Sequence, residues 1–114
     1  MTKISILTLN RYQEKAKTTA VFPECFGIIY CALAINGEAG ELAEKVKKII
    51  RDHDGEWTEE KKRAAALELG DILWYLANCA DQLGYTLNEV AQMNLDKLAD
   101  RYKRGKIKGS GDNR

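Results

Sequence analysis

The sequence predicts an all-α fold, with a four-helix antiparallel bundle-like protomer. Two observations support this prediction. The 114 residues contain one proline, Pro23, and nine glycines, which is too few turn-forming residues for a set of short strands. Apolar residues recur at helical rather than alternating spacing over most of the chain. The length and a composition of 45% hydrophobic and 31% charged residues are typical of one globular domain, which we expect to span residues 1–104.

The first two helices are separated by a proline. The first is expected from Thr8 to about Thr19, and it ends before Phe22-Pro23 because the residue before a proline is disfavoured in the helical region. The second is expected from Glu24 to Arg51. Its first part, residues 26–35, is apolar on nearly every side, so we expect it to be buried.

Capping residues mark the start of the other two helices. Thr58 is a suitable N-cap for a third helix that continues to about Leu83. Thr86 and Glu89 have the spacing of a capping box, which predicts a fourth helix to about Arg104. The remaining residues, 105–114, are expected to form a flexible, basic, glycine-rich tail.

Charge is distributed unevenly along the chain. The totals are 18 basic and 17 acidic residues, a balance that argues against a dedicated nucleic-acid binder. Residues 101–114, however, contain six basic residues and one acidic residue, whereas residues 1–100 contain 12 basic and 16 acidic residues. The sequence therefore predicts an acidic domain followed by a basic C-terminal segment.

Neither a membrane span nor a targeting segment is expected. The longest apolar stretch, residues 26–35, is too short to cross a bilayer, and the first residues do not have the pattern of a signal peptide. The three cysteines form no Cys-x-x-Cys motif, and with a single histidine they argue against a zinc site. We expect reduced cysteines and a cytoplasmic protein.

Two pairs of carboxylates are the most informative feature of the sequence. Glu38 and Glu41 are three residues apart in the second expected helix, and Glu68 and Asp71 are three apart in the third. Residues at this spacing lie on one helix face, and two helices joined by a short turn tend to pack antiparallel. The four carboxylates would then repel one another, and a hard divalent cation such as Mg²⁺ or Mn²⁺ would relieve that repulsion.

The surroundings of the second pair strengthen this interpretation. Glu68 and Asp71 lie within residues 67–77, which are otherwise almost wholly apolar, so their charges have little exposed face available. Glycine is unfavourable inside a helix, and its presence beside acidic residues suggests a close backbone approach or room for a ligand. These glycines are Gly37, Gly40 and Gly70. For the first pair, an ordinary solvated face over residues 38–48 is the competing interpretation.

The acidic motifs resemble those of the all-α nucleoside triphosphate pyrophosphohydrolases of the MazG-like type. The family pattern is Glu-x-x-Glu, a gap and Glu-x-x-Asp. Here it stands as Gly37-Glu38-Ala-Gly-Glu41-Leu, then 26 residues, then Glu68-Leu-Gly-Asp71-Ile-Leu-Trp-Tyr75. The resemblance covers roughly residues 29–102.

The resemblance implies hydrolysis of a nucleoside triphosphate between the α and β phosphates, to the monophosphate and pyrophosphate, as nucleotide-pool house-cleaning. It implies that Glu38, Glu41, Glu68 and Asp71 bind Mg²⁺. For the attacking water, Glu41 is the preferred activating group and Glu38 the alternative. Glu44, one turn further along the helix, is a possible helper. The resemblance also implies a homodimer or homotetramer with sites near the subunit interface, and the apolar segment 26–35 independently favours at least a homodimer.

Further side chains are candidates for substrate binding. Similar proteins place phosphate contacts on the fourth helix, although a polar helix face is the alternative interpretation there. They also place aromatic side chains near the base, although Tyr75 is equally compatible with a core position. The candidates are Asn94, Lys97 and Arg101 for phosphate, Phe22 and Tyr75 for stacking, and Gln13 for an amide contact with a base edge. We expect the basic tail to fold over the bound triphosphate.

Three alternative functions can be compared with the sequence. A phosphoribosyl-ATP pyrophosphohydrolase shares the helical fold and is compatible with the sequence. A non-catalytic helical dimerisation or regulatory module would bind no Mg²⁺ and would tolerate replacement of Glu68. A di-iron carboxylate bundle is excluded, because it requires two Glu-x-x-His motifs and the chain has one histidine.

Overall fold

The computed structural model describes residues 6–114, and within that range the chain is helical with no strand. The elements are α1 (Leu9–Lys17), a short 3-10 turn η1 (Glu24–Phe26), α2 (Gly27–His53), α3 (Glu59–Gln82) and α4 (Leu87–Lys103). The predicted all-α class is confirmed. None of the helices in the described range has the length and apolar character needed to cross a bilayer.

The predicted caps start α3 and α4. The Thr58 hydroxyl accepts a hydrogen bond from the backbone N–H of Lys61 at 3.2 Å. The Thr86 hydroxyl accepts one from the N–H of Glu89 at 3.1 Å, and the Glu89 carboxylate accepts one from the N–H of Thr86 at 3.3 Å. These bonds satisfy N–H groups that have no partner within the helix, so the helix starts were predictable from local sequence.

The second helix begins later than expected. Pro23 is followed by η1, so regular α-helix starts at Gly27 rather than at Glu24. At the other end α2 extends to His53, and Asp54 closes it in the left-handed conformation at φ 52°. Such a closing residue is common at helix C-termini, because it satisfies free carbonyl groups of the last turn.

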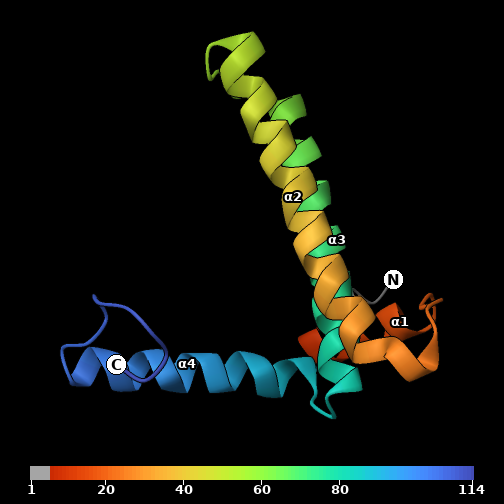
Figure 1. Cartoon of the computed structure of the whole chain (residues 1–114), viewed down its shortest axis with the longest axis vertical. Coiled ribbons are helices and arrows are strands. Elements are labelled where there is room, and N and C mark those ends of the chain that lie inside the picture. The colour runs from red at the N-terminus through yellow and green to blue at the C-terminus, as the bar shows by residue number, and fades with distance from the viewer. Residues whose placement is uncertain (1–5) are drawn as a thin grey trace, which may run out of the picture.

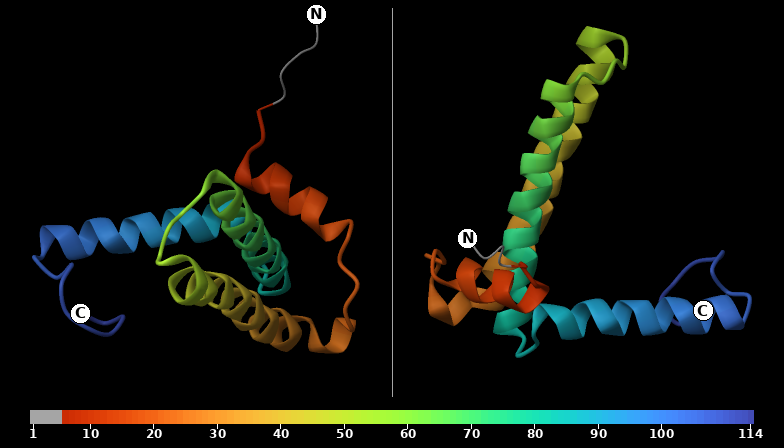
Figure 2. Two further views of the ribbon diagram at one scale, coloured as in Figure 1. Left: turned by 90° about the horizontal axis from the view of Figure 1, so that it is seen from above. Right: turned by 180° about the vertical axis from the view of Figure 1, so that it is seen from behind.

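The four helices do not close into an antiparallel bundle, which corrects the prediction for the single chain. Helices α2 and α3 form a long antiparallel hairpin, α1 crosses its base, and α4 leaves the base at a steep angle (Figures 1 and 2). Helix α4 contacts α1 and α3 but not α2 in the described part of the chain. The turn that redirects the chain contains Gly84 at φ 85°, a conformation that favours glycine.

The core is small and lies where α1, α3 and α4 meet. Only a few apolar side chains are fully buried there, and aromatic and leucine side chains pack around them. The buried members are Ala16, Ala77 and Leu87, and Tyr12, Leu73 and Trp74 pack against them. This core fixes the base of the hairpin and leaves most of its length without a covering helix.

Gln13 ties the three elements of the base together. Its side chain is 6% exposed. The Nε2 amide donates to the carbonyl oxygens of Ala77 and Tyr85, at 3.1 Å each, and the Oε1 oxygen accepts from the N–H of Leu87 at 2.9 Å. One buried amide therefore joins α1 to the end of α3 and the start of α4.

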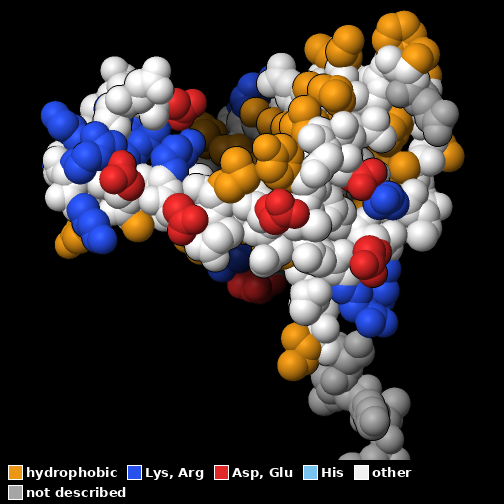
Figure 3. All heavy atoms as spheres, turned by 90° about the horizontal axis from the view of Figure 1, so that it is seen from below, with side chains coloured by type: hydrophobic (Ala, Val, Ile, Leu, Met, Phe, Trp, Pro, Cys, Tyr) orange, Lys and Arg blue, Asp and Glu red, His pale blue; other side chains and the backbone are white. Residues whose placement is uncertain are grey.

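The chain exposes more surface than a compact protein of its size. Its accessible area is 8976 Å², against about 6,300 Å² for a folded monomer of this mass. The radius of gyration is 17.4 Å, against about 13 Å for a compact domain of this length. Figure 3 shows hydrophobic side chains gathered in exposed groups on the face seen from below.

The apolar segment 26–35 accounts for part of this surface. We expected it to be buried, and within one chain this is wrong. Phe26, Ile29 and Leu33 are 58%, 60% and 70% exposed, although Cys31 is fully buried. The reason is that α4, which would cover such a face in a closed bundle, points away from it (Figure 1).

The role of Gln13 can be tested by Gln13→Ala. We expect the free energy of unfolding to fall by about 2–3 kcal/mol, because the buried N–H of Leu87 and two carbonyls lose their partner. Urea denaturation at one fixed protein concentration measures this change. Glu14→Ala, at the exposed neighbouring position, should stay within about 0.5 kcal/mol of wild type. Equal effects of the two substitutions would contradict the proposed tie.

Candidate metal centre

Three of the four predicted carboxylates meet on the hairpin. Glu38 lies on α2, and Glu68 and Asp71 lie on α3. One carboxylate oxygen of each lies within 4.8 Å of the others. Glu38 and Glu68 are half-buried, and Asp71 is exposed. The antiparallel packing of α2 and α3 therefore faces the two acidic motifs toward each other, as their spacing suggested.

Glu41 lies outside this group of three. Its side chain is exposed, one turn further along α2 than Glu38. It is still close enough for its charge to raise the pKa of Glu38, although Asp71 and Glu68 contribute more. Glu41 therefore borders the cluster without belonging to it.

The cluster is electrostatically unfavourable by itself. Partial burial is the largest cause of a raised pKa at Glu38, and the charges of Asp71, Glu68 and Glu41 add to it in that order. Both causes disfavour the ionised carboxylate. A divalent cation would remove this penalty.

The donor set fits Mg²⁺ or Mn²⁺. All three groups offer oxygen, the ligand these hard cations prefer. Two oxygens on opposite sides of Mg²⁺ lie about 4.2 Å apart, so modest side-chain rotation would let the three carboxylates share one ion. The exposure of Asp71 leaves one side of the cluster open to water and substrate.

Lys45 is a cation next to the cluster. Its Nζ lies 3.6 Å from Oε1 of Glu68, and the two side chains are 41% and 16% exposed. This lysine lies within residues 38–48, for which an ordinary solvated face was the competing interpretation. Its position seven residues after Glu38, on the same helix face, was the available signal. Lys45 offsets some of the negative charge and can contact a phosphate held at the carboxylates.

Aromatic side chains adjoin the other side of Glu38. Burial is the largest cause of a raised pKa at Tyr75, and the neighbouring Tyr30 and Glu38 raise it further. Phe22 stacks on Tyr30, with ring centroids 5.5 Å apart and an angle of 21° between the planes. Phe22, Tyr30 and Tyr75 thus form an aromatic wall near the carboxylates. Tyr30 was missed, although it lies eight residues, two helical turns, before Glu38.

Helix α1 also reaches the site. Burial raises the pKa of Tyr12, and the charge of Asp71 raises it further, so Tyr12 lies within electrostatic range of the cluster. No local sequence pattern indicated this proximity, because it depends on how α1 packs against α3. Gln13 is occupied by the backbone of α3 and α4. A nucleotide base would have to displace these partners to reach the Gln13 amide.

The predicted phosphate contacts lie on α4 and away from the carboxylates within one chain (Figure 1). Asn94 and Lys97 line a shallow pocket with Val90 and Met93. Arg101 is buried further along the helix. Within the described residues, helix α4 contacts α1 and α3 but not α2, the helix that carries Glu38.

The three helical glycines are not required by close packing within the chain. A Cβ atom at Gly37, Gly40 or Gly70 would meet no heavy atom within 4 Å beyond the local helix. Of the two explanations for these glycines, a close backbone approach is therefore wrong for the described chain. The other explanation, room for a ligand beside the acidic residues, agrees with the open space at these glycines.

Comparison with known proteins identifies the family. Residues 29–105 match the family described as the MazG nucleotide pyrophosphohydrolase domain. This chain belongs to the MazG family. The matched residues include all four acidic positions of the two motifs. Membership indicates a pyrophosphohydrolase and agrees with the all-helical fold.

A relative in a phage supports the same grouping. The Gene 37 protein of Mycobacterium phage L5 is 49% identical over 109 residues, which cover 90% of this MazG chain and 96% of the relative. No solved structure gives a significant match.

The repulsion at Glu38 predicts a change in thermal stability. Because its pKa is raised, its contribution to stability falls as the pH rises from the ordinary value through the raised one. At neutral pH in EDTA, Glu38→Gln should therefore increase Tm, by roughly 2–4 °C. Added Mg²⁺ should increase the Tm of wild type more than that of the variant.

Glu44→Gln is the matched control. Glu44 lies on the same helix, and its hydrogen bond with Lys47 lowers its pKa, so removing its charge should not increase Tm. A Tm decrease for Glu38→Gln in EDTA would contradict the proposed repulsion. Differential scanning calorimetry measures both variants.

Proposed function

We propose that this MazG chain hydrolyses a nucleoside triphosphate between the α and β phosphates, to the monophosphate and pyrophosphate, in a Mg²⁺-dependent reaction. The proposed role is nucleotide-pool house-cleaning. The observation that supports it most is the meeting of Glu38, Glu68 and Asp71 within 4.8 Å, inside the residues that match the family.

Glu38, Glu68 and Asp71 would hold the metal, with Glu41 available from the next turn. Bound Mg²⁺, or Mn²⁺, would supply positive charge against the triphosphate. The chain itself orients the carboxylates, because the antiparallel hairpin holds side chains of α2 and α3 close together. Lys45 adds a fixed positive charge beside Glu68, where it would contact a phosphate oxygen.

Glu41 is the preferred group for activating the attacking water, and Glu38 is the alternative. Glu41 is exposed and outside the group of three, so an unshared carboxylate oxygen can accept a proton from water. Partial burial and the neighbouring negative charges raise the pKa of Glu38, and a raised pKa also suits a proton acceptor.

The aromatic wall would bind the base. Phe22, Tyr30 and Tyr75 lie on the side of Glu38 opposite to Lys45 along α2. Stacking on aromatic rings is tolerant of base identity, because every base presents a π face. This arrangement favours an enzyme that accepts several nucleotides.

We also propose that the protein is a homodimer or homotetramer. The excess surface and the exposed apolar side chains of residues 26–35 support this assembly. A second copy would also supply an α4 helix, and with it Asn94, Lys97 and Arg101, to a carboxylate cluster that lacks them in its own chain.

The catalytic proposal is tested by pyrophosphate release with Mg²⁺ across common and damaged nucleoside triphosphates. We expect activity in wild type and a loss of at least about 100-fold in Glu68→Gln, because a metal ligand is removed. Glu59→Gln, a charge loss at the exposed start of α3 on the same hairpin, outside the cluster, should retain activity.

Two outcomes would favour the alternatives. Activity confined to phosphoribosyl-ATP would favour the corresponding pyrophosphohydrolase. Absence of activity, together with no Mg²⁺ binding and an unchanged assembly in Glu68→Gln, would favour a non-catalytic helical module.

The assembly is tested by light scattering at micromolar concentration. We expect two or four times the chain mass of 12.8 kDa. Leu33→Glu places a charge at an apolar position that is 70% exposed, and it should shift the protein toward monomer. Arg63→Glu, at an exposed polar position, should not. A wild-type mass near 12.8 kDa would overturn the proposal.

A further inference from the structure

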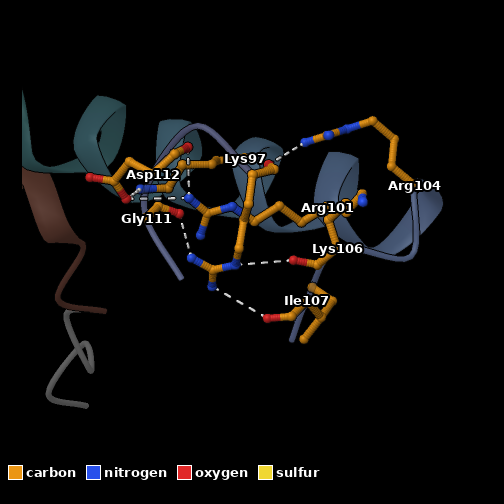
Figure 4. Close-up of polar contacts among 8 residues, drawn as sticks. Lys97, Arg101, Arg104, Lys106, Ile107, Gly111 and Asp112 are labelled. Atoms are coloured by element: carbon orange, nitrogen blue, oxygen red, sulfur yellow. Dashed lines mark hydrogen bonds and ion pairs between the residues drawn. The ribbon is translucent and has the colours of Figure 1, made fainter. Parts of the chain in front are cut away.

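Residues 105–114 fold back along α4 (Figure 4). The Arg114 guanidinium closes this segment by donating to the carbonyl oxygens of Lys106 at 3.1 Å, Ile107 at 3.3 Å and Gly111 at 2.5 Å. Arg104 donates to the carbonyl oxygen of Arg114 at 2.7 Å. The segment is therefore held by polar contacts to its own backbone.

The folded segment covers Arg101. The Arg101 side chain is 6% exposed. Its Nη2 donates to the carbonyl oxygen of Asp112 at 2.9 Å and to the Asp112 carboxylate at 3.2 Å. The Nζ of Lys97, one turn earlier on α4, lies 3.5 Å from the same carboxylate oxygen. Two cations thus converge on one internal anion.

Among the described residues, Asp112 leaves one hydrogen-bond donor of Arg101 without a partner. The Nε of Arg101 is buried and has no hydrogen-bond partner in the described chain. A buried donor without a partner is costly, and guanidinium groups bind best when two of their N–H groups reach one anion. A phosphate group offers more acceptor oxygens than Asp112 provides, and it would reach both Nε and Nη2.

We propose that Asp112 occupies the phosphate contacts Lys97 and Arg101 as an internal anion of the same chain, and that the pyrophosphate part of the substrate displaces it. The identity of the anion rests on the proposed function. The contacts of Asp112 with Arg101 and Lys97 are observed independently of that function.

The contacts of Asp112 are weak enough for an external anion to replace it. The Asp112 side chain is 85% exposed, so its ion pairs are weak. Arg101 and Lys97 hold the pKa of Asp112 below its usual range, which keeps this competitor charged at neutral pH. Gly109 and Gly111, at φ 124° and 83°, flank the contact and can rearrange freely.

The test is calorimetric binding of inorganic pyrophosphate in EDTA, so that the carboxylate cluster holds no metal. Asp112→Asn keeps the size of the side chain and removes its charge, and we expect roughly fivefold tighter binding. Asp96→Asn is the matched control, because it removes one charge from α4 at a carboxylate whose partner in the described residues is Gln92. It should bind as wild type does.

Arg101→Gln should abolish the tighter binding when combined with Asp112→Asn. In wild type, pyrophosphate should also shift the NMR amide signals of Gly109 and Gly111, a readout that needs no variant to fold. Equal affinity of wild type and Asp112→Asn, an equal gain in Asp96→Asn, or no binding to any variant would each overturn the proposal. Failure of nucleotide hydrolysis alone would leave this result intact, since no metal or turnover is involved.

Discussion

The site depends on the antiparallel packing of α2 and α3. This packing brings Glu38 within 4.8 Å of Glu68 and Asp71, at a cost that appears as the raised pKa of Glu38. A hairpin optimised only for stability would not place three carboxylates together, because like charges and partial burial both oppose their ionisation. The arrangement is explained when a divalent cation binds there, which agrees with membership of the MazG family.

The single chain is an incomplete unit in two respects. Its core occupies the base, where Gln13 joins α1, α3 and α4, while most of the hairpin is left without a covering helix. Its phosphate-binding candidates lie on α4, which points away from the carboxylates. One assembly would remedy both features, because a second copy would cover apolar surface and bring its own α4 to the hairpin.

The distribution of cations suggests an order of events in the proposed reaction. Lys45 lies 3.6 Å from Glu68 and its side chain is 41% exposed, so its charge is accessible to an arriving substrate. Arg101 is covered by the C-terminal segment, and its charge becomes available only when Asp112 leaves. In the proposed reaction, the chain would thus supply one constant and one conditional contact for phosphate. The observed contacts of Asp112 are internal to residues 97–112, and the proposed anion would take its place there.

The sequence by itself determined the helices and the acidic motifs. Capping residues such as Thr58 and Thr86 act within one turn, and Glu-x-x-Glu spacing fixes which side chains share a helix face, so both are readable without packing. The tertiary structure alone decided that Glu41 borders the cluster, that Tyr30 and Tyr12 adjoin it, and that α4 diverges. Helix rotation and crossing angle depend on contacts between residues far apart in the chain, and no local pattern encodes them.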